Sequence, residues 1–137
     1  MWKQSCAALT LVGALSSSPA IAADLQGIWA MVPLKSGVAN VLEFDESNAT
    51  VHAFECYGQG EVDQSADAET TAYSRAAQTI TLSAEGKTVG TLDIKSLSAN
   101  ELTLFQAIDG MPNGGTSFVY RKADSVKPLC ELYQEPQ

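Results

Sequence analysis

Histidine and basic side chains are scarce in this sequence. Of its 137 residues, 8 are Lys or Arg, 16 are Asp or Glu and one is a histidine, His52, so the formal net charge is −8. Basic surfaces bind nucleic acids and anionic membranes, and we therefore expect neither as a partner. Catalytic triads and dyads need a positioned base, and no G-x-S-x-G, H-E-x-x-H or phosphate-loop motif occurs. We predict a non-enzymatic protein with no metal site and no cofactor.

A hydrophobic run long enough to span a bilayer is also missing. The apolar run at residues 6–15 has about ten residues, whereas a transmembrane helix needs ~20. It follows Lys3 and precedes a stretch of small residues, which is the pattern of a secretory signal peptide. Residues 20–22 (Ala-Ile-Ala) fit the cleavage rule. We predict a signal peptide over residues 1–22, with cleavage after Ala23 as the alternative.

Cysteine is limited to two residues in the predicted mature chain, 23–137, which we expect to be periplasmic or secreted. These are Cys56 and Cys130. An even pair in an exported chain indicates a disulfide, and closing a loop of about 74 residues would contribute roughly 4 kcal/mol. The alternative is a thiol nucleophile or metal ligand, but the sequence lacks C-x-x-C spacing and a histidine cluster. We predict the Cys56–Cys130 disulfide.

Short alternating segments separated by turn residues make up most of the mature chain. Alternation of apolar and polar residues between Gly, Pro, Asn and Asp is typical of strands. The eight predicted strands are 27–34, 38–44, 50–56, 70–75, 78–83, 88–95, 101–108 and 117–122. Residues 58–68 are predicted to be the longest loop, and 128–133 a short C-terminal helix. This pattern indicates one all-β domain, either an antiparallel sandwich or a closed barrel.

The first and last predicted strands carry a resemblance to a known family. Residues 25–29 (Leu-Gln-Gly-Ile-Trp) contain a G-x-W motif, and Arg121 lies on the last strand. This pattern resembles the lipocalin and lipocalin-like families, in which a basic residue of the last strand packs over that tryptophan. The resemblance implies an up-and-down eight-stranded β-barrel in which Gly27, Trp29 and Arg121 are structural. A guanidinium over an indole ring contributes ~1 kcal/mol.

A barrel of this kind is expected to hold a small apolar ligand or to engage a protein. Alternation places Leu42 and Phe44 on one face of their strand, and His52 and Phe54 on one face of the next. Together with Leu104, these side chains are the predicted lining of a ligand cavity.

Negative charge is concentrated in one part of the chain. Residues 36–74 contain eight acidic side chains and no Lys or Arg. One explanation is the solubility of an exported protein. The other is attraction of a basic protein partner, for which Glu61, Asp63, Asp67 and Glu69 are the predicted contacts. Small bacterial inhibitors of secreted proteases and lysozymes are similar compact, disulfide-closed barrels. An inhibitor or immunity-type protein that blocks such an enzyme is therefore the alternative function.

Overall fold

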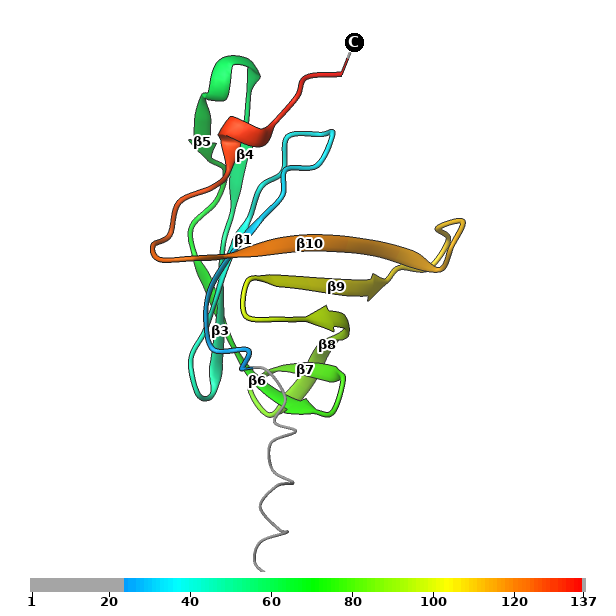
Figure 1. Ribbon diagram of the computed structural model, residues 1–137. Helices are drawn as coiled ribbons and strands as arrows, with labels where there is room; N and C mark the ends of the chain where they lie inside the picture. Colours follow the sequence, from blue (N-terminus) through cyan, green and yellow to red (C-terminus); the bar gives the residue numbers. More distant parts are fainter. Residues whose placement is uncertain (1–23, 137) are drawn as a thin grey trace, which may run out of the picture.

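The structure, a computed structural model, describes residues 24–136, and eight of its strands close into an antiparallel barrel (Figure 1). The order around the barrel is β1-β10-β9-β8-β7-β6-β3-β2. The predicted all-β, eight-stranded antiparallel barrel is thus confirmed, whereas the predicted signal peptide lies outside the described residues. The strands are β1 (Gly27–Met31), β2 (Val41–Phe44), β3 (Asn48–His52), β4 (Phe54–Cys56), β5 (Val62–Gln64), β6 (Glu69–Ala76), β7 (Thr79–Ala84), β8 (Lys87–Leu97), β9 (Glu101–Ala107) and β10 (Gly115–Ala123).

The barrel forms because its strands carry apolar side chains at alternate positions, which then point into a common interior. Trp29 of β1 is fully buried there, as are Ile80 of β7 and Leu102 and Leu104 of β9. The long strand β8 shifts register against both of its neighbours. Such bulges bend a strand and increase its twist, which helps a sheet of this size to close.

β7 and β8 form the hairpin that the sequence predicts. Its turn contains Glu85 and Gly86, and both have positive φ angles, 54° and 79°. Two consecutive residues with positive φ match the right-handed twist of paired strands, and glycine adopts this conformation without a steric penalty.

β4, η2 (Gly58–Gly60) and β5 form a lobe outside the barrel, residues 54–64, called the lobe below (Figure 1). The sequence predicted one strand over 50–56, but the barrel ladder ends before Ala53, whose carbonyl accepts the N–H of Ser65 (3.0 Å). β4 pairs with β5 on one side and with the β1–β2 connection on the other, where the Cys56 N–H donates to the Gly37 carbonyl (2.7 Å). The predicted 58–68 loop therefore contains a strand.

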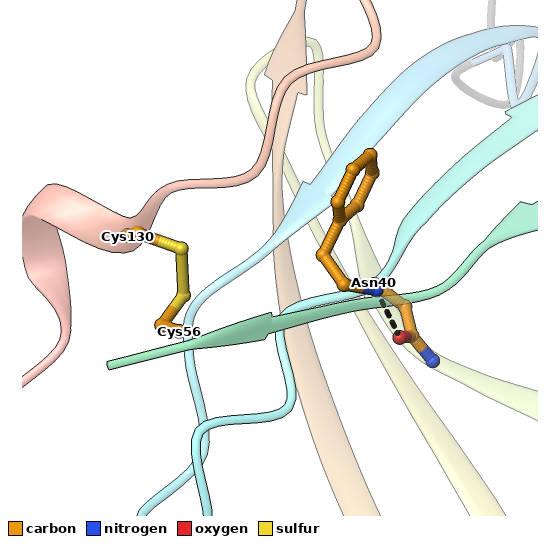
Figure 2. The surroundings of a disulfide bond; sticks show 4 residues. Asn40, Cys56 and Cys130 are labelled. Carbon is orange, nitrogen blue, oxygen red and sulfur yellow. Dashed lines mark hydrogen bonds between the residues drawn. A yellow bond between two sulfur atoms is a disulfide. The ribbon is translucent and has the colours of Figure 1, made fainter. Parts of the chain in front are cut away.

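The predicted disulfide between Cys56 and Cys130 is present, with an S–S distance of 2.04 Å. Figure 2 shows it joining the end of β4 to the C-terminal segment. The predicted helix over 128–133 is a single 3-10 turn, η3 (Cys130–Leu132). In this turn the Leu132 N–H donates to the Leu129 carbonyl (2.9 Å), a bond of the i to i+3 type. Both cysteines are buried with Ala39, so the bond fixes the C-terminal segment against the lobe.

The two ends of the barrel differ. Because strand directions alternate, the connections 32–40, 53–68 and 108–114 and the β7–β8 turn lie at one end, called the open end. The start of the described chain and the other connections lie at the opposite end, called the closed end. There the Trp29 Nε1–H donates to the carbonyl of Leu25 (2.8 Å), and both side chains are buried. The closed end is therefore sealed by Trp29 under the first described residues.

Candidate ligand-binding site

A cavity of about 310 Å³ lies inside the open end of the barrel. Ligand pockets in proteins start at roughly this size and are lined mainly by apolar side chains. Six barrel strands (β1, β2, β3, β7, β8 and β10) contribute apolar side chains to its wall, and β9 contributes one polar side chain. The lining residues are Met31, Val38, Asn40, Leu42, Val51, Leu82, Leu92, Gln106, Phe118 and Tyr120.

Among residues 24–136, no Asp, Glu, Lys, Arg or His lines this cavity. Its polar side chains are Asn40, Gln106 and Tyr120. The Asn40 side-chain oxygen accepts the Phe54 N–H (3.3 Å), which Figure 2 shows as a dashed line. This bond links the cavity wall to the lobe. Gln106 is exposed. The cavity therefore offers an uncharged, largely apolar surface.

Tyr120 is the buried polar side chain of the cavity. It lies on β10 opposite Met31 of β1 and Leu102 of β9, and its exposed fraction is 4%. Burial raises the pKa of Tyr120, because the charged phenolate would lose its hydration. Among residues 24–136, its hydroxyl has no hydrogen-bond partner. A buried tyrosine hydroxyl normally has one, so the position is unusual for a side chain with a purely structural role.

The cation over Trp29 at the closed end is Lys122, and the prediction that Arg121 packs there is wrong. The β1–β10 register pairs Trp29 with Lys122 and Ala30 with Arg121, so the two basic side chains point to opposite faces. Lys122 Nζ lies 4.7 Å from the centroid of the Trp29 ring and donates to the carbonyl of Gln26 (2.8 Å). The predicted interaction exists, but with the neighbouring residue.

Gly27 of the G-x-W motif has a φ of +123°, in the region that favours glycine. A Cβ at this position would lie 2.5 Å from Lys122 Nζ. The absence of a side chain at Gly27 thus leaves room for the lysine that covers Trp29, which supports the predicted structural role of this glycine.

His52 does not line the cavity, which corrects the prediction. On β3 the side chains of Ala49 and Val51 belong to the interior, so His52 points outward, opposite Val41. Its Nε2 lies 2.7 Å from the Glu43 carboxylate on the outer face. Phe54, predicted to share its face, is a residue of β4 in the lobe and is also absent from the cavity.

Of the other predicted lining residues, Leu42 lines the cavity, whereas Phe44 and Leu104 do not. Both are buried in the core. Phe44 packs edge-on against Tyr73 of β6, with ring centroids 5.1 Å apart. The inward face of β2 was thus predicted correctly, but the position of Phe44 along the barrel axis was not. Alternation alone does not say which end of a strand lies at the opening of the barrel.

Sequence reasoning missed most of the cavity. The alternation that groups Leu82 with Ile80 and Leu92 with Ile94 was visible, and it places Leu82 and Leu92 on inward faces. No signal marked Tyr120 or Phe118, because they lie in an ordinary alternating strand and their importance depends on neighbours distant in the sequence.

The acidic residues Glu61, Asp63, Asp67 and Glu69 are all exposed. Glu61 and Asp63 belong to the lobe, and the register places Asp63 directly opposite Glu55. The charge of Glu55, with burial and then Asp63 as smaller causes, raises the pKa of Tyr57. The lobe therefore carries a local negative potential. Among the described residues, no group of three or more His, Cys, Asp or Glu is placed to hold a metal ion.

No helix within residues 24–136 combines the length and apolar character that crossing a membrane requires. Searches against protein-family models, curated proteins and solved structures found no match to this chain.

Proposed function

We propose that the protein is a non-enzymatic, exported binding protein that holds a small, largely apolar ligand in the open end of its barrel. The observation that carries this proposal is the uncharged 310 Å³ cavity, which opens at one end of a barrel sealed by Trp29 at the other. The Cys56–Cys130 disulfide supports export, because such bonds persist in oxidising compartments.

The cavity suits a compact molecule. An engineered apolar cavity of roughly 150 Å³ holds benzene, so twice that volume fits a ligand of about 12 non-hydrogen atoms. At typical ligand efficiencies, a well-fitting molecule of this size binds with a Kd in roughly the micromolar range.

Calorimetric titration with butylbenzene tests the proposal. We expect saturable binding to the wild-type protein and at least tenfold weaker binding to Leu92→Trp, because the indole ring occupies part of the cavity that Leu92 lines. Thr91→Trp is the matched control, since Thr91 is exposed on the other face of the same strand. Equal binding of butylbenzene to Leu92→Trp and to the wild type would contradict the proposal.

A second candidate function is inhibition of a basic secreted or periplasmic enzyme, of the protease or lysozyme class, through the lobe. What favours it is the composition of the lobe surface. The exposed side chains of Tyr57 and Val62 lie there among the carboxylates of Glu55, Glu61 and Asp63. Exposed apolar groups surrounded by charge of one sign are typical of protein-binding surfaces.

A further inference from the structure

We propose that the cavity selects uncharged ligands that carry one hydrogen-bonding oxygen, a hydroxyl or a carbonyl, and that this oxygen pairs with the Tyr120 hydroxyl at the inner end of the cavity. This inference rests on the proposed function and specifies its ligand class.

The position of Tyr120 supports a deep polar contact. Inward-facing residues of β10 follow one another from the open to the closed end as Phe118, Tyr120 and Lys122. Lys122 already contacts Trp29 and Gln26, so Tyr120 is the last side chain of this series that faces the cavity. A ligand that enters from the open end therefore meets Phe118 first and Tyr120 at full insertion.

The hydroxyl of Tyr120 is free to make that contact. Tyr120 is nine-tenths buried and lines the cavity, and its hydroxyl has no hydrogen-bond partner among the described groups of the chain. A buried hydroxyl without a partner is destabilising relative to one that is paired. A ligand oxygen at this point would supply the missing bond, and a tyrosine hydroxyl pairs equally well with a carbonyl or another hydroxyl.

The other polar groups of the wall lack these properties. Asn40 is only half-buried and its side-chain oxygen already accepts the Phe54 N–H, and Gln106 is exposed to water. The described part of the chain also supplies no charged side chain to the cavity wall that could pair with an ionised ligand group. Burying an unpaired carboxylate or ammonium is far more costly than burying a neutral oxygen, so charge on the inserted end selects against a ligand.

Three probes with one carbon skeleton separate these contributions: butylbenzene, 4-phenylbutan-1-ol and 4-phenylbutanoate. Each is titrated calorimetrically at neutral pH into the wild-type protein and into Tyr120→Phe, which removes only the hydroxyl. We expect Tyr120→Phe to weaken binding of the alcohol about five- to tenfold and to change binding of butylbenzene less than twofold. The carboxylate should bind wild type at least tenfold more weakly than the alcohol does.

Tyr57→Phe is the matched control, because Tyr57 lies in the lobe and does not line the cavity. It should leave the affinities for all three probes unchanged, and thermal unfolding confirms that both variants are folded. The inference is overturned if Tyr120→Phe leaves binding of the alcohol unchanged, if it weakens the alcohol and butylbenzene equally, or if the carboxylate binds as well as the alcohol. Failure of all three probes to bind wild type would instead overturn the proposed function itself.

Discussion

At the scale of single residues, the closed end depends on one lysine. Lys122 contacts the Trp29 ring and the Gln26 carbonyl, and Gly27 leaves the space that it occupies. Arg121, the adjacent base, points to the outer face, opposite Ala30. We therefore expect these two neighbouring basic residues to contribute differently to stability, because successive side chains of a strand point to opposite faces.

Lys122→Met retains most of the aliphatic chain but removes the charge. We expect it to lower the free energy of unfolding by about 1–2 kcal/mol, because a cation–π contact and one hydrogen bond are lost. Arg121→Met should change it by less than about 0.5 kcal/mol, as is usual at exposed positions. Urea denaturation followed by tryptophan fluorescence measures both. A larger loss from Arg121→Met than from Lys122→Met would show that the lysine does not seal this end.

At the scale of elements, the break after β3 creates the lobe and one wall of the opening. Once the chain leaves the barrel ladder at Ala53, β4 pairs with the β1–β2 connection and with β5. Asn40, in that connection, both lines the cavity and accepts the Phe54 N–H. The disulfide then attaches this arrangement to the C-terminal segment. The rim of the cavity is thus held by a covalent bond outside the barrel.

Replacing both cysteines, Cys56→Ser with Cys130→Ser, tests the contribution of this bond. Chain entropy assigns about 4 kcal/mol to a cross-link with a sequence separation of 74 residues, and we expect a loss of about 2–4 kcal/mol in the free energy of unfolding. Urea denaturation with and without a reductant measures it. The reduced wild-type protein should match the double variant, and an unchanged unfolding midpoint in both would contradict a stabilising role.

At the scale of the whole molecule, the barrel and the disulfide could be predicted from the sequence, whereas the cavity could not. Alternation over eight segments and an even pair of cysteines are local signals. On β3, however, the predicted strand continued through Phe54 and Cys56, which made the face of His52 look apolar. The barrel ladder ends before Ala53, and this break depends on pairing with segments distant in the sequence. The depth of Phe44 or Leu104 depends in the same way on the packing of the closed barrel.

The concentration of negative charge on the lobe predicts that a basic protein associates with it faster at low salt. Association with a basic probe protein such as lysozyme should slow at least tenfold between roughly 20 mM and 200 mM salt, because steering by exposed charge is screened over this range. Surface plasmon resonance measures the association rate.

A triple variant that neutralises the lobe, Glu55→Gln with Glu61→Gln and Asp63→Asn, should lose most of this salt dependence. A matched variant with the same net charge neutralises Asp93, Glu101 and Asp109, which are exposed and lie outside the lobe. It should retain the salt dependence. Equal effects of the two variants would assign the attraction to net charge and would count against the lobe as the contact surface.

The seal formed by Trp29 at the closed end also determines how a ligand of the proposed kind would be exchanged. A container with one opening admits and releases its ligand by the same route, so an incoming molecule cannot push a resident one out from behind. The bound molecule must then leave the cavity completely before another molecule can enter. The rate at which a bound molecule leaves would then be independent of the concentration of its competitor, because the competitor cannot enter until the cavity is empty.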